Sequence, residues 1–248
     1  MEKIITSTDN SLVKEAKSLQ DKKFRKKYGK FLVDGEKLVR ESLEKGLKID
    51  RIFVDKNKFE NFTYFLDDFS GEKIMTTPQV IKTITENQAP QGIIAEVFVP
   101  QNANLDDGDV LVLDRIQDPG NLGTMLRTAI ATGINNIILI DSVDAYSPKV
   151  VRSSSGAVFS LNIMSKTEEE TIKYCKEFGK TLLVADMNGE NVFKTKSKFE
   201  NFALVIGNEG QGVSQNFKNN GKIISLPMKS EMESLNAGVS ARDRKSVV

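Results

Sequence analysis

Histidine is absent from the chain, and cysteine occurs once, as Cys175. A zinc site of histidine and cysteine ligands is therefore excluded, and so is a catalytic triad that depends on histidine. A magnesium site made of carboxylates alone is conceivable, but no cluster of aspartates indicates one, so we expect no metal. A single thiol cannot close an internal disulfide, which is typical of the reducing cytosol, and we expect a cytoplasmic protein.

Long hydrophobic runs are also missing. No apolar segment approaches the ~20 residues of a membrane helix. The N-terminus has no apolar stretch before a small-residue cleavage site, so we expect neither a membrane span nor export. The hydrophobic fraction of 39% and the charged fraction of 28% are ordinary for a globular protein of one large or two modest domains.

The net charge of +1 hides one strongly basic segment, residues 14–30, in which eight lysines and arginines face only two acidic residues. Such cations can neutralise phosphates, and the interleaved Phe24 and Tyr28 can stack on bases. The alternative is an ordinary solvated basic helix. The candidate RNA-binding residues are Lys22, Lys23, Arg25, Lys26 and Lys27.

Two domains with different patterns are expected. The first, residues 1–100, alternates helix and strand as a small α/β domain does, and residues 101–108 form a polar linker. Its predicted elements are a helix opening at residues 34–36, strands at 51–54, 73–76 and 92–99, and a helix starting at Pro78.

The second domain, residues 107–248, has continuous apolar strands of a kind that a parallel sheet buries on both faces. The predicted strands are 110–113, 137–140, 182–185, 203–206 and 223–226, and the predicted helices are 122–132 and 168–178. This order indicates a doubly wound sheet, in which ligands bind beyond the carboxyl ends of the strands.

The loop after the first of these strands, residues 114–123, carries Asn121, which we expect to cap the following helix. Arg127 is expected on the side of that helix away from its apolar stripe, near the helix start. An asparagine and an arginine there suit an anionic ligand, although a lone arginine is more often just exposed.

Two further loops follow predicted strands. Residues 207–212 have the spacing G-x-x-G-x-G, which lets backbone amides approach a ligand but also suits a plain turn. Glu209 is unusual in such a loop, because a phosphate site would avoid a carboxylate. The third loop runs from residue 224 to residue 236, where Ser234 or Asn236 can cap a helix.

Together, D-P-G-N-L-G-x-x-x-R, I-G-N-E-G-Q-G and L-P-M…E-S-L-N resemble the three signature motifs of the SpoU/TrmH family of RNA 2′-O-ribose methyltransferases. The resemblance covers residues 110–236. It implies a C-terminal SPOUT-type trefoil-knotted parallel-sheet domain, preceded by a small ribosomal-protein-like α/β domain that binds the RNA substrate.

The resemblance also implies a reaction: transfer of a methyl group from S-adenosyl-L-methionine to a ribose 2′-hydroxyl, by a homodimer. Ribosomal RNA of the 23S type is favoured over transfer RNA. The implied cofactor-binding residues are Gly207, Leu226 and Leu235. The implied catalytic residues are Asn121, Arg127, Glu209, Ser234 and Asn236.

Some alternatives stay open. Arg127 is either a base or a clamp that holds a phosphate and stabilises the developing alkoxide. After residue 236 the family continues with an apolar helix, whereas residues 242–248 are charged, so we expect a truncated or altered helix there. A noncatalytic RNA-binding or ribosome-assembly protein on the same fold is the alternative function, and titration with S-adenosylmethionine separates the two. A nucleotide-dependent enzyme would need a fingerprint that is missing.

Overall fold

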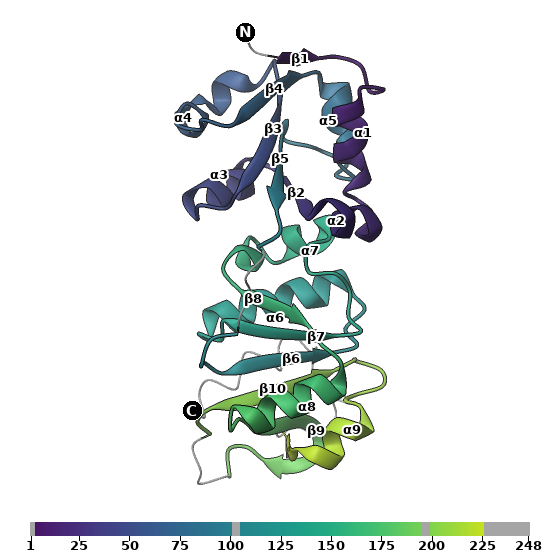
Figure 1. Cartoon of the computed structure of the whole chain (residues 1–248), viewed down its shortest axis with the longest axis vertical. Helices are drawn as coiled ribbons and strands as arrows, with labels where there is room; N and C mark the ends of the chain where they lie inside the picture. Colours follow the sequence, from purple (N-terminus) through teal and green to yellow (C-terminus); the bar gives the residue numbers. More distant parts are fainter. Residues whose placement is uncertain (1–2, 101–104, 195–198, 226–248) are drawn as a thin grey trace. The chain divides into compact units, whose positions relative to one another are not determined.

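The computed structural model describes residues 3–100, 105–194 and 199–225 (Figure 1). The chain divides into two compact units that are not continuous in sequence. Unit 1 comprises residues 1–101 and 146–159, and unit 2 comprises residues 102–145 and 160–248. Segment 146–159, which the sequence places in the second domain, therefore packs with the first.

Unit 1 contains a five-stranded mixed sheet in the order β1-β4-β3-β5-β2. Its strands are β1 (Lys3–Ile5), β2 (Lys30–Asp34), β3 (Ile49–Asp55), β4 (Glu72–Thr76) and β5 (Ile93–Phe98). The strands predicted at 51–54, 73–76 and 92–99 are confirmed. β2 escaped prediction because its three apolar residues are flanked by Lys30 and Asp34, which are buried as well.

The helices of unit 1 cover both faces of this sheet (Figure 1). They are α1 (Ser11–Ser18), α2 (Lys22–Tyr28), α3 (Glu36–Glu44), α4 (Thr63–Leu66), α5 (Pro78–Ile84), α7 (Pro148–Ser153) and the 3-10 turns η1 (Phe59–Asn61) and η2 (Ala157–Phe159). The predicted starts of α3 and α5 are confirmed. Segment 146–159 is anchored on β2, because the buried Phe31 ring lies 5.0 Å from the Tyr146 ring and 6.3 Å from the Phe159 ring.

Unit 2 contains a six-stranded parallel sheet in the order β11-β9-β10-β6-β7-β8. The strands are β6 (Val110–Asp114), β7 (Asn136–Ile140), β8 (Asn162–Ser165), β9 (Thr181–Asn191), β10 (Phe202–Gly207) and β11 (Lys222–Ser225). The predicted parallel sheet is confirmed. β8 was missed, because this edge strand is only partly buried and lacks the continuous apolar run of its neighbours.

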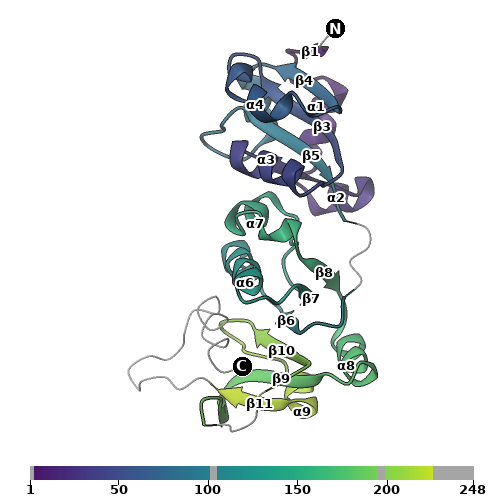
Figure 2. The same ribbon diagram turned by 90° about the vertical axis from the view of Figure 1, so that its left-hand side faces the viewer.

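Helices pack on both faces of the sheet of unit 2 (Figure 2). They are α6 (Pro119–Ala131), α8 (Glu168–Glu177) and α9 (Gln215–Asn220). Alternate strand residues such as Val110 and Val112 share one buried cluster with Ile172 of α8 and Phe217 of α9. Leu111, which points to the opposite face, is buried too, which explains the continuous apolar runs.

The chain order of this sheet creates a switch point. β6 and β10 are neighbours, but the chain goes from β6 to β7 on one side and from β10 to β11 on the other. A crevice forms where successive connections leave in opposite directions, and ligands of doubly wound folds bind there. The expected knot depends on residues 226–248, which lie outside the described residues. In the described part of the chain, no helix combines the length and apolar character needed to cross a bilayer.

Candidate functional site

The loops after β6 and β10 begin side by side, because Asp114 and Gly207 are paired in the parallel register. A side chain at Gly207 is excluded, since its Cβ would lie 2.3 Å from the carbonyl carbon of Gly212 and 2.4 Å from its oxygen. The loop folds back on itself here, with the Gly212 amide donating to the Asn208 carbonyl at 2.8 Å. The glycines therefore fix a tight backbone path at the carboxyl end of β10.

Asn208 organises this loop from within. Its Oδ1 accepts hydrogen bonds from the amides of Gly210 at 2.9 Å and Gln211 at 3.1 Å. Its Nδ2 donates to the Arg115 carbonyl at 3.1 Å. The asparagine thus holds the glycine loop and ties it to the loop after β6, a role that we did not predict for it.

An ion pair between Asp114 and Arg115 lies at the end of β6, and both of its members also hydrogen-bond to the loop after β10. The Asp114 carboxylate, which is fully buried, accepts hydrogen bonds from Arg115 Nε at 3.0 Å and Nη2 at 3.1 Å, and from the Ser214 amide at 2.9 Å. Arg115 also donates to Gln211 Oε1 and to the Gly212 carbonyl, both at 3.1 Å. The hydrogen bond with Asp114 raises the pKa of Arg115, so the guanidinium stays charged.

Arg115 adopts an unusual backbone conformation, with φ +58°. The left-handed region is unfavourable for a residue with a Cβ, and it persists where the surroundings hold it in place. Neither Asp114 nor Arg115 was among the predicted site residues. The sequence did offer a signal for these two residues, because they are a charged pair directly after a fully apolar predicted strand.

The start of α6 corrects the prediction for Asn121. Asp118 is the N-cap, and its Oδ1 accepts the Asn121 amide at 2.8 Å, with Pro119 as the first helical residue. Asn121 occupies the third position of α6, and its side chain projects away from the helix. Its Nδ2 donates to Glu209 Oε1 at 2.6 Å, so the structure joins two of the predicted catalytic residues directly.

Arg127 lies further along α6. Its side chain is exposed and lies away from the apolar stripe to which the buried Met125 and Leu126 belong, as predicted. Six residues after Asn121, it is displaced by ~9 Å along the helix and by about 120° around it. It makes no hydrogen bond or ion pair with any residue of the described ranges, so its charge is available to an anionic ligand.

Four predicted site residues cannot be located, because Leu226, Ser234, Leu235 and Asn236 lie outside the described residues. β11 ends at Ser225, immediately before the first of them. The described part of the site consists of the loops after β6 and β10 and the start of α6.

Within the described ranges, three carboxylates of unit 1 lie close enough to share a cation: Glu15, Asp50 and Glu96. The Lys30 ammonium lies among them, 3.0 Å, 2.7 Å and 3.5 Å from their oxygens. A lysine therefore fills the place that a metal ion would take. Burial raises the pKa of Glu96 to about 7.

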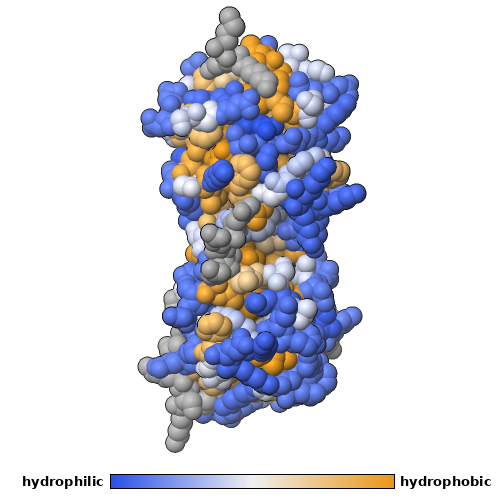
Figure 3. Space-filling view, in the orientation of Figure 1, coloured by the Kyte–Doolittle hydropathy of each residue, from blue (hydrophilic) through white to orange (hydrophobic). Residues whose placement is uncertain are grey.

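The basic helix α2 presents four of the five predicted RNA-binding cations to solvent. Lys22, Lys23, Lys26 and Lys27 are exposed, and this part of the surface is hydrophilic in Figure 3. Arg25 is a correction: it is buried, and its Nη1 donates to the carbonyls of Leu19 and Gln20, both at 2.7 Å. These two bonds hold Arg25 against the residues that follow α1, so it is not available to RNA in this structure.

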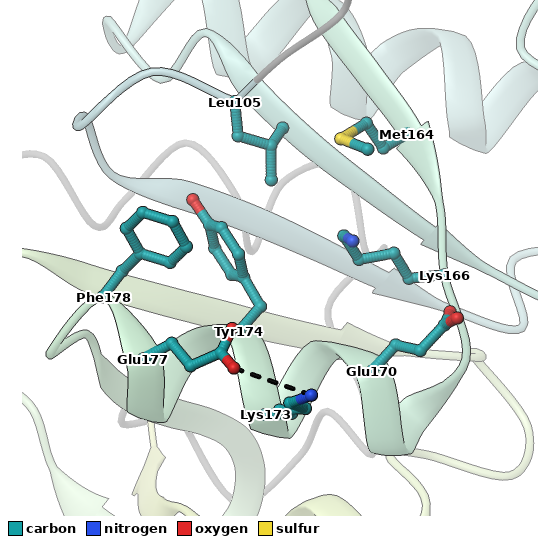
Figure 4. Close-up of a pocket in the computed structure, with 8 residues that line it drawn as sticks. All are labelled: Leu105, Met164, Lys166, Glu170, Lys173, Tyr174, Glu177 and Phe178. Carbon is teal, nitrogen blue, oxygen red and sulfur yellow. Dashed lines mark ion pairs between the residues drawn. The ribbon is translucent and has the colours of Figure 1, made fainter.

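Unit 2 also has a cavity of about 460 Å³ beside α8 (Figure 4). It lies between the rings of Tyr174 in α8 and Phe178 directly after α8, and Met164 of β8. Lys173 forms an ion pair with Glu177 at 3.7 Å. None of the predicted site residues lines this cavity, and we assign it no part in the site.

The fold and the joined loops define a class: a doubly wound, all-parallel α/β domain with two loops joined at its switch point, preceded in sequence by a mixed α/β unit. Residues 109–242 match the model of the SpoU rRNA Methylase family, and residues 10–95 match that of the MRM3-like substrate binding domain. The chain therefore belongs to the SpoU rRNA methylase family.

Relatives of known name support this membership. RlmP of Bacillus subtilis (strain 168), a 23S rRNA (guanosine(2553)-2′-O)-methyltransferase, is 32% identical over 243 residues, 96% of each chain. A 23S rRNA (adenosine(1067)-2′-O)-methyltransferase of Streptomyces azureus is 35% identical over 151 residues, 57% of this chain and 56% of the relative.

Solved structures of similar proteins match across both units. The AdoMet-bound rRNA methyltransferase from Sinorhizobium meliloti is 27% identical, with a TM-score of 0.87 over 99% of this chain and 98% of that one. The SpoU methyltransferase AviRb from Streptomyces viridochromogenes, in complex with AdoMet, is 27% identical, with a TM-score of 0.84 over 96% of each chain.

Proposed function

We propose that this chain transfers a methyl group from S-adenosylmethionine to a ribose 2′-hydroxyl of 23S-type large-subunit ribosomal RNA. Family membership supports the reaction class, and the names of the relatives support the RNA. The observation that carries the proposal for the site is the hydrogen bond between Asn121 and Glu209, because it joins two of the three motif loops at the switch point of the sheet.

The residues present fit the cofactor. At Gly207 the backbone of Gly212 fills the space of a side chain, whereas no described atom lies within 4 Å of the place that a Cβ of Gly212 would take, so a ligand can approach the backbone closely at Gly212. Gly207, with Leu226 and Leu235, would hold the adenosyl part through the backbone. When bound, S-adenosylmethionine supplies a methyl group on a positively charged sulfur, which is already activated for displacement.

The chain's own groups then have to align the ribose and manage its proton. In the transfer, a bond would form between the 2′-oxygen and the methyl carbon as the sulfur–methyl bond breaks, and the hydroxyl proton would pass to solvent water. The polar pair of Asn121 and Glu209, with Ser234 and Asn236, would orient the ribose, and good alignment is worth ~7–11 kcal/mol. An arginine side chain is a cation with five N–H donors and no acceptor, so we assign Arg127 to a phosphate and to the developing alkoxide.

The test is methyl transfer from labelled S-adenosylmethionine to ribosomal RNA, followed by mapping of the modified nucleotide. We expect a 2′-O-methyl mark in large-subunit RNA and none in transfer RNA. A mark on a base would contradict the assigned chemistry. Heat of S-adenosylmethionine binding, measured by titration calorimetry, separates the enzyme from a noncatalytic RNA-binding protein, which should show none.

We also propose that the enzyme works as a cytoplasmic homodimer, with residues 1–100 as the RNA-binding part. The exposed lysines of α2 support the RNA contact, because lysines near phosphates release counterions. Sedimentation equilibrium should give twice the mass of one chain. Replacement of Lys22, Lys23, Lys26 and Lys27 by alanine should flatten the salt dependence of RNA binding, whereas the same slope as in the unaltered protein would remove α2 from the interface.

A further inference from the structure

Unit 1 has a pocket of about 260 Å³ at the amino end of α3. Residues from three parts of the chain line it, among them Asp34, Lys37, Leu38, Gln91, Arg152 and Ser155. No residue of the loops after β6 and β10 lines this pocket, and none of the site residues predicted from the sequence does. Its volume is near the lower limit of small-molecule sites.

Two opposite charges line this pocket without pairing. Asp34 is 8% exposed, and its Oδ2 accepts a hydrogen bond from Thr85 Oγ1 at 2.6 Å. Its Oδ1 is buried without a partner among the described residues, and so is Nη1 of Arg152. The Arg152 side chain forms no ion pair within the described ranges either. Buried polar atoms are rarely left unbonded, so each of these atoms has hydrogen-bonding capacity that the described residues leave unused.

The start of α3 adds further donors. This nine-residue helix begins after Gly35, whose φ is +102° and which has no side chain to cap it. Gln91 Oε1 accepts the Glu36 amide at 2.7 Å. The amides of the next two residues, Lys37 and Leu38, have no acceptor within a helix, and both residues line the pocket. Such an amino end favours an anion.

We propose that this pocket binds one nucleotide of the single-stranded RNA substrate. Its phosphate would lie against Arg152 and the amides at the start of α3, and an N–H group of its base would donate to Asp34 Oδ1. A phosphate alone would leave that carboxylate without a donor and place two negative charges together. A nucleotide supplies both partners, because its phosphate accepts hydrogen bonds from Arg152 and the helix amides and its base donates one to Asp34. Carboxylates commonly accept hydrogen bonds from base N–H groups. The inference rests on the proposed function, which makes RNA the substrate.

The test uses the full chain and equilibrium binding of a fluorescent single-stranded RNA. A matched oligomer of abasic ribose phosphates keeps the phosphates and lacks the bases. The variants are Arg152→Ala and Asp34→Asn, with Lys82→Ala as a control that removes an exposed cation from α5 of the same unit. Thermal unfolding checks that each variant is folded.

We expect Arg152→Ala to weaken binding of both oligomers about tenfold. Asp34→Asn should weaken only the RNA that carries bases, and Lys82→Ala should change either affinity less than twofold. Equal affinity of Arg152→Ala and the unaltered protein for RNA overturns the site. Equal loss of RNA and abasic oligomer in Asp34→Asn overturns the base contact and leaves a phosphate site.

Calorimetry with S-adenosylmethionine separates this inference from the proposed function. The cofactor should bind both variants as tightly as the unaltered protein, because neither residue belongs to the switch-point loops. If both variants retain cofactor binding and methyl transfer and their RNA affinity is unchanged, the proposed nucleotide pocket is overturned and the proposed function is not. Absence of cofactor binding and methyl transfer in the unaltered protein would overturn the proposed function.

Discussion

The side-chain amide of Asn121 donates a 2.6 Å hydrogen bond to Glu209 Oε1 and so joins the start of α6 to the loop after β10, across 88 positions of the sequence. The bond is possible because β6 and β10 are neighbours in the sheet and the two loops leave them at the same edge. Because the bond links the side-chain amide of Asn121 to the carboxylate of Glu209, replacing either residue should disturb the position of the other.

The first prediction concerns this pair. Asn121→Ala and Glu209→Gln should each lower kcat for methyl transfer about ten- to a hundredfold, since a hydrogen bond to a charged group contributes ~1.5–3 kcal/mol. Steady-state methylation of ribosomal RNA measures this. The double variant should lose little more than the worse single one, because the two residues act together. Fully multiplicative losses would mean that they act separately.

The second prediction concerns Arg127, which is exposed and makes no hydrogen bond or ion pair with the described residues. Arg127→Ala should weaken RNA binding and lower kcat, and Arg127→Lys should recover part of the RNA affinity, because lysine keeps the charge but not the guanidinium geometry. RNA affinity and methyl transfer are measured separately for each variant. Normal turnover in the alanine variant would remove Arg127 from the mechanism.

The third prediction concerns Arg115, which holds the glycine loop from a left-handed backbone position. Arg115→Ala should raise the Kd for S-adenosylmethionine about tenfold, because the loop loses its tie to Asp114. Arg115→Gly should bind as weakly but be more stable than the alanine variant by about 1 kcal/mol, since glycine is unstrained at a positive φ.

Calorimetry and thermal unfolding supply the two measurements for Arg115. For the glycine variant, affinity for the cofactor should fall while the backbone strain is relieved. A purely structural role of Arg115 would not separate these two effects. Cofactor affinity that stays unchanged in Arg115→Ala would show that the ion pair serves stability only.

The fourth prediction concerns the pH dependence of stability. Burial raises the pKa of Glu96 to about 7, above its ordinary value of 4.5, so the folded state favours the protonated carboxyl. The stability from this group is complete below pH 4.5 and is lost as the pH rises to 7. The free energy of unfolding should therefore fall between pH 5 and pH 8, by about 2–3 kcal/mol from this group alone.

Glu96→Gln should remove the part of the fall in unfolding free energy that Glu96 causes, because a side-chain amide does not titrate. Urea unfolding at several pH values between 5 and 8 measures the difference between the variant and the unaltered protein. Glu72→Gln, which alters a more exposed acid near the same Arg51, is the control. Parallel pH curves for the unaltered protein and Glu96→Gln would show that Glu96 titrates at its ordinary pKa.

The accuracy of the sequence-based predictions followed the burial of each element. The strands of the parallel sheet were predicted because burial on both faces demands continuous apolar runs, as in β6 and β10. The edge strand β8 and the strand β2 lack such runs and were missed. β2 ends in charged residues whose burial depends on partners elsewhere, as Lys30 does on Asp50 and Glu96.

At the site, the local sequence indicated which types of residue take part but not which residues they contact. Asn121 suits an N-cap by its chemistry, but Asp118 takes that position and leaves the asparagine to reach Glu209. Arg25 was grouped with the exposed lysines of α2, yet the fold turns it inward to two backbone carbonyls. Helical spacing by itself did correctly place Arg127 on the exposed side of α6.

The sequence by itself determined the class of chain: periodicity and apolar runs specify helices and parallel strands, and three motifs in order specify the family. Only the tertiary structure decided which distant residues meet. Asp114 and Arg115 hold the glycine loop, and Arg152 lies near Asp34, because strand order and packing bring them together. Local propensity acts over a few residues, whereas these contacts depend on where the whole chain places its strand ends.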